Sequence, residues 1–241
     1  MIPTYNEAES LPKLVSALLS LPLDIKILVV DDNSPDGTGH VAEELVAQDK
    51  RVHVLHREGK LGLRSAYFSG FDYLLKQECD AILQMDADFS HDPERIPDMA
   101  RRLESCDLVL GSRYVAGGSV DVLWPAWRKL LSAFANSYAR MILGMSQHDI
   151  TTGFRLWRRE TLERMPLEQV KSNGYVFLVE MVYLAYCLKY HIEEVPIYFA
   201  ERRSGKSKMS FKIQAEAALR VWHVWWHYRN IRRLGKTARL R

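Results

Sequence analysis

The run Ile25-Lys26-Ile27-Leu28-Val29-Val30-Asp31-Asp32 decides the fold, because a short apolar segment ends abruptly in two acidic residues. Such a run is typical of a strand buried on both faces, as in parallel sheets. Three more short apolar runs are also typical of buried parallel strands, at Val52–Leu55, Ala81–Met85 and Leu108–Leu110. Helical patterns precede or separate these strands, at Glu7–Leu19, Gly39–Gln48, Ser65–Lys76 and Pro93–Leu103. The alternation predicts an α/β, Rossmann-like fold with a mostly parallel sheet, helices on both faces, and ligands beyond the carboxyl ends of the strands.

The first strand of this sheet is expected to be short. Only Met1 and Ile2 precede the polar cluster Pro3–Glu7, whereas a strand usually has about five or six residues. We therefore expect a stunted strand and a loss of stability there. We also expect Asn6 to cap the helix that follows. The polar start predicts no signal peptide.

The pattern of elements changes after residue 112. We expect further elements at Leu123–Leu143 (helix), Ile150–Trp157 (strand), Tyr175–Tyr190 (helix), Glu194–Phe199 (strand) and Phe211–Arg233 (helix). The last helix is amphipathic, since its polar positions recur every three or four residues. The best candidate for a membrane span, Val176–Leu188, has only 13 residues and contains Glu180, so no spanning helix is predicted.

The charges are divided unevenly along the chain. There are 33 Lys and Arg against 30 Asp and Glu, but residues 201–241 hold 12 basic and 2 acidic side chains. This indicates either a tail that meets an anionic partner or a solvated tail. A hydrophobic fraction of 47% with 26% charged residues excludes disorder, collagen and coiled coil. The three cysteines show no paired spacing, which favours a reduced compartment without disulfides or a zinc site.

The segment Asp86-Ala87-Asp88 follows a predicted strand. Alternate side chains of an extended segment point the same way, so both carboxylates can face one site. Two such oxygen ligands suit Mg²⁺ or Mn²⁺, and Ser90 and His91 can join them. The alternative is a pair of solvated turn carboxylates.

Other polar clusters also follow predicted strands. Asp31 and Asp32 can accept hydrogen bonds from ribose hydroxyls or base N–H groups, or they can belong to a simple turn. Arg113 adjoins a glycine-containing loop after the fourth strand. Further cations suited to phosphate oxygens, among them surface charges, are Arg128, Arg155, Arg202, Arg203, Lys206 and Lys208. The sequence has no glycine-rich nucleotide fingerprint of the Walker or dinucleotide-binding type.

Taken in order, the motifs resemble family 2 inverting glycosyltransferases, and within that family the polyprenol-phosphate (dolichol-phosphate) mannosyltransferases. The segments that match are Pro3–Glu7, Val30–Thr38, Asp86–Pro93, Gly111–Val115, Thr152–Arg155, Gly174–Met181 and Glu194–Ile197, followed by Arg202, Gly205, Ser207 and Lys208. The likeness extends to about residue 210. One position departs from it: the family usually has Lys-x-Gly-x-Gly where this chain has Lys60-Leu61-Gly62-Leu63-Arg64.

The resemblance implies a GT-A fold, with a catalytic domain over residues 1–210 and a basic, amphipathic, membrane-interface helix and tail over residues 211–241. It implies transfer of mannose from GDP-mannose to a polyprenyl (dolichyl) monophosphate with inversion, giving a β-D-mannosyl phosphate. The implied nucleotide-sugar ligands are Pro3, Tyr5, Glu7, Asp32, Lys60, Asp86 and Arg202. The implied ligands of Mg²⁺ or Mn²⁺ are Asp86, Asp88 and Ser90, those of the acceptor phosphate are Arg113, Arg128 and Ser132, and the catalytic residues are Asp88, Arg113 and Arg128.

A phosphate acceptor bears on both mechanism and location. Because the second pKa of a phosphate monoester is about 6, the acceptor needs no strong general base. Asp149 is then an orienting or a structural residue. The tryptophan-rich helices and the basic tail predict a protein on the cytoplasmic face of a membrane, peripherally bound, with or without a membrane-anchoring subunit.

Other functions compatible with the motifs are a polyprenyl-phosphate glucosyltransferase that uses UDP-glucose, and a non-catalytic nucleotide-sugar binding subunit. A phosphohydrolase is disfavoured because its Asp-x-Asp usually ends the first strand. No aromatic–basic sheet motif or recognition helix is present, so we expect no nucleic-acid partner.

Overall fold

The structure is a computed structural model that describes residues 1–201 and 211–237, apart from the side chains of 211–215 and 234–237. The main strands are β1 (Ile2–Thr4), β2 (Ile27–Asp31), β3 (Val52–His56), β4 (Ala81–Gln84), β5 (Leu108–Ser112), β7 (Arg155–Arg158) and β8 (Ile192–Pro196). The helices are α1 (Leu11–Leu19), α2 (Thr38–Gln48), α3 (Leu63–Leu74), α4 (Ile96–Leu103), α5 (Ala126–Leu143), α6 (Arg159–Arg164), α7 (Gly174–Cys187), α8 (Phe211–His227) and α9 (Arg229–Thr237). Smaller pieces are β6 (Ser119–Val120), β9 (Tyr198–Phe199) and the 3-10 turns Pro93–Arg95 and Leu167–Gln169.

The sheet is mostly parallel, as the sequence predicts. Strands β1, β2 and β3 pair in parallel, and β5 pairs in parallel with β8. Strand β7 runs against both of its neighbours, β4 and β5. The two sets of strands meet where the Met1 amino group donates to the Leu83 carbonyl at 2.9 Å. Strand β1 has three residues, so the expected short strand is present. Its effect on stability stays a prediction.

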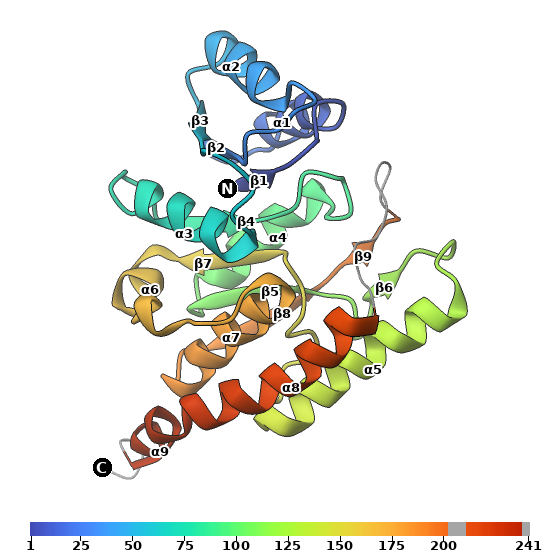
Figure 1. The fold of residues 1–241 in the computed structure, drawn as a ribbon. Helices are drawn as coiled ribbons and strands as arrows, with labels where there is room; N and C mark the ends of the chain where they lie inside the picture. Colours follow the sequence, from blue (N-terminus) through green and yellow to red (C-terminus); the bar gives the residue numbers. More distant parts are fainter. Residues whose placement is uncertain (202–210, 238–241) are drawn as a thin grey trace.

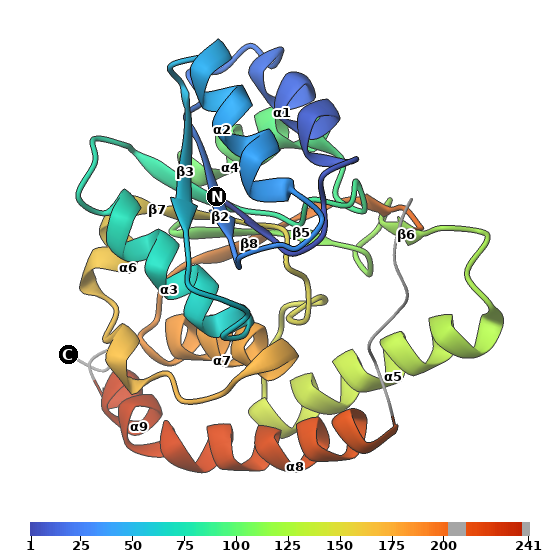
Figure 2. The same cartoon turned by 45° about the horizontal axis from the view of Figure 1, so that its top comes forward.

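Helices cover both faces of this sheet (Figure 2). Successive side chains of a strand point to opposite faces, so the apolar side chains of β2 alternate between two cores. Ile27 and Val29 pack in the core to which α1, α2 and α4 contribute. Leu28 and Val30 pack in the core to which α3, α5 and α7 contribute. Fully buried strands of this kind occur where helices cover both faces, which confirms the predicted fold class.

Two expectations about helix ends are wrong. Helix α1 begins at Leu11 rather than at Glu7, because the amides of residues 6–8 donate to side chains of Ser34, Thr38 and Asp36 after β2. Asn6 has a φ of 65°, in the left-handed region, and does not cap the helix. The expected single helix over Phe211–Arg233 is divided into α8 and α9 at Tyr228. The Tyr228 side chain is fully buried, and its hydroxyl donates to the Glu180 carboxylate at 3.0 Å.

Helix α8 lies beside α5 and also packs on α7 (Figure 1). The indole of Trp222 donates to the Tyr138 hydroxyl at 3.0 Å, which links α8 to α5. The proposed division of the chain at residue 210 stays a prediction. Among the residues that the structure describes, no helix combines the length and apolar character needed to cross a lipid bilayer.

Candidate active site

The loops that follow β1 and β2 are joined by hydrogen bonds. The Thr4 hydroxyl donates to Asp31 at 3.0 Å, and the Glu7 amide donates to the Thr38 hydroxyl at 2.9 Å. These contacts bring Tyr5, between the two anchored positions, to the carboxyl end of the sheet. The Lys60 ammonium lies 3.6 Å from the centroid of the Tyr5 ring, a cation–π contact. The structure therefore places together four of the predicted nucleotide-sugar ligands: Pro3, Tyr5, Glu7 and Lys60.

Asp32, the next predicted ligand, is paired with an arginine that the sequence analysis missed. The guanidinium of Arg57 donates to the Asp32 carboxylate and also to the Ser65 hydroxyl, so it connects β2 to α3. Burial raises the pKa of Asp32 above its usual range, although the positive charge of Arg57 opposes the rise. Arg64, the departure from the family pattern, lies in the first turn of α3 with its guanidinium carbon 5.2 Å from the Phe68 ring centroid.

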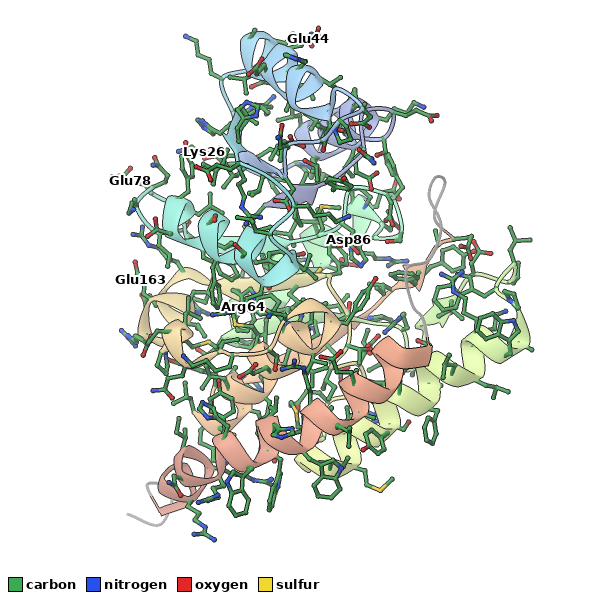
Figure 3. The ribbon with its side chains drawn as sticks, in the orientation of Figure 1. Lys26, Glu44, Arg64, Glu78, Asp86 and Glu163 are labelled. Carbon is green, nitrogen blue, oxygen red and sulfur yellow. The ribbon has the colours of Figure 1, made fainter. Side chains whose placement is uncertain are left out.

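Asp86 and Asp88 lie in a turn just beyond the end of β4, and Figure 3 labels Asp86. The turn is stabilised from within, because the Ser90 amide donates to Asp88 at 3.0 Å and the Asp86 amide donates to His91 Nδ1 at 3.1 Å. Phe89, within this turn, has a φ of 60°, in the left-handed region of backbone conformation. Asp88 and Ser90 are both buried, with exposed fractions of 6% and 0%.

This turn can contribute ligands to a divalent ion. Within residues 1–201 and 211–237, no group of three or more His, Cys, Asp and Glu side chains is arranged around a metal position. The Ser90 hydroxyl is buried and has no hydrogen-bond partner in the described part of the chain. Two carboxylates and one hydroxyl fit an ion that takes its remaining ligands from phosphate and water, as Mg²⁺ commonly does.

The aromatic ring of Phe199, on β9, connects this turn to the predicted phosphate ligands. It meets the His91 ring edge to face, with centroids 5.5 Å apart. It also lies 5.3 Å from the guanidinium carbon of Arg113 and 5.6 Å from the Trp124 ring. The guanidinium carbon of Arg128 lies over the Trp124 ring, 3.8 Å from its centroid. The fold therefore gathers both predicted catalytic arginines near the Asp86–His91 turn.

Arg113 is held by a buried carboxylate. Its Nε donates to Asp149 at 2.7 Å and its Nη2 donates to the same carboxylate at 2.8 Å. Burial alone would lower the pKa of Arg113 and raise that of Asp149, but the mutual attraction and hydrogen bonds reverse both shifts. The remaining nitrogen, Nη1, lies 3.5 Å from the hydroxyl of Ser132, the third predicted phosphate ligand, which also bonds the Tyr114 hydroxyl at 2.8 Å.

Arg128 makes an ion pair that the sequence analysis missed. Its Nη1 lies 2.8 Å and 2.7 Å from the two carboxylate oxygens of Glu201. The signal was present in the sequence, since Glu201 directly precedes the predicted ligand Arg202. Arg202 itself lies outside the described residues, as do Arg203, Lys206 and Lys208.

Arg155 is not available as a phosphate ligand. It is fully buried and donates to the carbonyl groups of Thr152, Leu178 and Ile150 at 2.7–3.2 Å. Burial lowers its pKa to about 9. Three carbonyl acceptors in a fork arrangement are a structural use of arginine, so this side chain belongs to the core.

The family model described as Glycosyl transferase family 2 matches residues 1–165. This chain belongs to glycosyl transferase family 2. It is 47% identical over 224 residues to a polyprenol monophosphomannose synthase of Mycolicibacterium smegmatis, covering 92% of this chain and 84% of that protein. It is 46% identical over 221 residues to an undecaprenyl-phosphate mannosyltransferase of Micrococcus luteus, covering 92% of this chain and 90% of that protein. The predicted family and enzyme class are thus confirmed, and the protein is a glycosyltransferase.

Solved structures that are similar to this family 2 enzyme in fold are far more distant in sequence. Glucosyl-3-phosphoglycerate synthase from Mycobacterium tuberculosis, in complex with Mn²⁺, UDP and glucosyl-3-phosphoglycerate, is similar with a TM-score of 0.63 and 17% identity. The match covers 94% of this chain and 77% of that chain. The complex of the same synthase with Mn²⁺ and UDP-glucose also matches, with a TM-score of 0.63 and 16% identity. The shared fold is that of GT-A glycosyltransferases, as predicted.

Proposed function

We propose that this glycosyltransferase transfers mannose from GDP-mannose to a polyprenyl monophosphate, with inversion at the anomeric carbon. The observation that carries the proposal is the convergence of Arg113 and Arg128 on the aromatic pair Phe199 and Trp124, beside the Asp86–His91 turn. Two arginines beside a pair of carboxylates suit an anionic acceptor that must approach an anionic donor. The names of the two relatives, both mannosyltransferases of polyprenyl phosphates, support the same choice.

In this proposal the donor lies at the carboxyl ends of β1, β2 and β4. Tyr5 with Lys60, and Asp32 with Arg57, bind the nucleotide, while Asp86, Asp88 and Ser90 hold Mg²⁺ or Mn²⁺. The Mn²⁺ and UDP in the M. tuberculosis synthase support such an ion with a nucleotide diphosphate on this fold. A divalent ion bound there supplies positive charge to the leaving diphosphate.

The acceptor phosphate attacks the sugar without a dedicated general base. Near neutral pH it is largely a dianion, so one of its oxygens is already a nucleophile. Arg113 Nη1, Arg128 and Ser132 bind and orient that phosphate against the anomeric carbon. The bond from carbon to the acceptor oxygen forms as the bond to the diphosphate breaks on the opposite face, so an α-linked donor gives a β-linked product. Asp149 positions Arg113 for this task.

The acceptor's hydrocarbon chain requires contact with a membrane, and we propose that α5 and α8 provide it. Large apolar side chains project from the exposed face of α5 at helical spacing, namely Trp127, Leu130, Phe134 and Met141, each 66–79% exposed. On the adjacent α8, Leu219, Trp222 and Trp226 are 52–66% exposed. Arg229 stacks on Trp226 at 3.6 Å, which combines a cation with an aromatic ring as at lipid interfaces. The part of the basic tail after residue 237 lies outside the described residues.

A transfer assay tests the proposal directly. The protein is incubated with Mg²⁺ or Mn²⁺, undecaprenyl phosphate in detergent, and either radiolabelled GDP-mannose or radiolabelled UDP-glucose. We expect a labelled lipid only from GDP-mannose. Labelled lipid from UDP-glucose alone would identify a glucosyltransferase instead, and donor binding without transfer from either donor would favour a non-catalytic subunit.

A further inference from the structure

The carboxylate of Glu201 is hydrogen-bonded to Nη1 of Arg128, a nitrogen that a phosphate oxygen would otherwise use. Both of its oxygens lie within 2.8 Å of Arg128 Nη1. The Trp124 ring covers one flat face of the guanidinium, with the ring centroid 3.8 Å from the guanidinium carbon. A guanidinium stacked on an indole presents its N–H groups at its edge, so a phosphate oxygen at Nη1 would compete with the Glu201 carboxylate.

Among the described residues, each of the two arginine charges is balanced by a carboxylate. Arg113 is paired with Asp149 and Arg128 is paired with Glu201. A second carboxylate beside a phosphate dianion would repel it, since like charges within a few ångströms disfavour each other. Withdrawal of one of the two carboxylates would therefore strengthen the binding of a phosphate.

Only Glu201 is placed to leave. The Asp149 side chain is fully buried and accepts three hydrogen bonds from Arg113, whereas the side chains of Glu201 and Arg128 are 34% and 24% exposed. The Glu201 backbone is fixed, because its amide donates to Asp121 at 2.9 Å, and Asp121 also accepts from the Leu123 amide ahead of α5. A rotation of the Glu201 side chain alone, toward solvent, exposes Arg128 without moving the helix or the strand.

We propose that Glu201 is an electrostatic gate, a carboxylate that holds the phosphate position on Arg128 until the acceptor phosphate displaces it. The inference rests on the proposed function in placing the acceptor phosphate at Arg128. The gate weakens binding of every phosphate by the free energy of the Glu201–Arg128 pair. A polyprenyl phosphate gains further binding from its hydrocarbon chain, whereas small phosphates in solution do not. Glu201 thus lowers the occupancy of the site by soluble phosphates, while the lipid acceptor still binds through its hydrocarbon chain, and the ratio of the two affinities is unchanged.

The variant Glu201→Gln tests the gate, because it keeps an oxygen that can hold Arg128 in place and removes the charge. Dissociation constants for inorganic phosphate and for water-soluble geranyl phosphate are measured by isothermal titration calorimetry on the whole protein, with no transfer reaction. We expect both ligands to bind the variant about 2- to 5-fold more tightly than the wild type, within the range for a partly exposed ion pair. The matched control is Glu193→Gln, which removes a surface carboxylate paired with Arg102 and should leave binding unchanged.

The Arg128→Gln background separates the gate from the proposed acceptor site. We expect Arg128→Gln to weaken phosphate binding and to abolish any further effect of Glu201→Gln. Weaker binding in Glu201→Gln would mean that the carboxylate merely positions Arg128, and it would overturn the gate. Equal binding by the two proteins, or no measurable binding by either, would overturn it as well. Failure of mannosyl transfer by the wild type would refute the proposed function but not a tighter binding of phosphate by Glu201→Gln.

Discussion

The guanidinium of Arg113 and the carboxylate of Asp149 form a two-pronged, buried ion pair, with nitrogen–oxygen distances of 2.7 Å and 2.8 Å. Arg113 Nη2 also donates to the Thr151 hydroxyl at 2.8 Å. These contacts use Nε and Nη2 and leave Nη1 directed to Ser132. The pair therefore fixes one arginine in a single orientation with one nitrogen facing the proposed acceptor site.

Replacing Arg113 with lysine should remove this orientation. A single ammonium cannot pair with Asp149 through two nitrogens and also reach a phosphate near Ser132. We expect kcat/KM for the polyprenyl phosphate to fall about 100-fold, in the range for loss of one preorganised charge donor, with the dissociation constant for GDP-mannose changed less than twofold. Steady-state kinetics and donor titration measure the two quantities. Unchanged acceptor kinetics would remove Arg113 from the reaction.

Asp149 should also stabilise the fold in a pH-dependent way. Its pKa is held below the usual range because the Arg113 charge and hydrogen bonds outweigh the effect of burial. The resulting stability is complete above the usual carboxyl pKa of about 4 and is lost as the pH falls through the lowered pKa of the folded state.

The variant Asp149→Asn tests the direction of this change in stability with pH. At pH 7 it leaves Arg113 buried without its counter-charge, which should reduce the free energy of unfolding by about 3 kcal/mol. Urea unfolding at pH 7 and at several pH values below 4 should show a difference from the wild type that becomes smaller as the pH falls. A difference that grows in acid would contradict the assignment.

Asp88 should be required for a metal-dependent transfer. The variant Asp88→Ala removes one of two carboxylates at the turn, so we expect Mn²⁺ affinity to fall and the transfer rate to fall at least about 100-fold. Calorimetry with Mn²⁺ and GDP, and the transfer assay after treatment with EDTA, provide the measurements. The conservative variant Ser90→Ala should have a smaller effect. Full activity of Asp88→Ala would remove the turn from the metal site.

The exposed side chains of α5 should bind membranes without supporting the fold. Trp127 and Phe134 are 66% and 68% exposed, so the double change to serine should alter stability by less than about 0.5 kcal/mol per site. Each large apolar side chain buried in a bilayer contributes about 1.5–3 kcal/mol, so we expect at least a tenfold loss in sedimentation with anionic vesicles. Leu61→Ser, an equally exposed change on the β3–α3 loop, is the control. Equal loss in both variants would contradict a specific membrane-facing surface on α5.

The features that the sequence predicts correctly are those that depend on neighbouring residues along the chain. Each apolar run followed by acidic residues became a strand, and Asp86 and Asp88 lie beyond the end of β4 as the alternation requires. The error at α1 is also local in origin: the Asn6 position favours a helix cap by residue type, but bonds from residues 7 and 8 to the loop after β2 delay the helix. The burial of Tyr228 between α8 and α9, where its hydroxyl donates to Glu180 in a distant helix, could not be predicted from neighbouring residues.

The sequence by itself determined the α/β class, the order of the elements and the position of the Asp86–Asp88 turn, because period and residue type act over a few neighbours along the chain. Only the tertiary structure decided the partners of the site. Arg113 meets Asp149 across 36 positions and Arg128 meets Glu201 across 73, and Phe199 joins both arginines to the turn. Such pairs depend on how β7 pairs with β5 and how β9 pairs with β6, far apart along the chain, which no local pattern encodes. Ionisation and access at the site follow from those distant pairings, since the charge of a buried group is set by what packs against it.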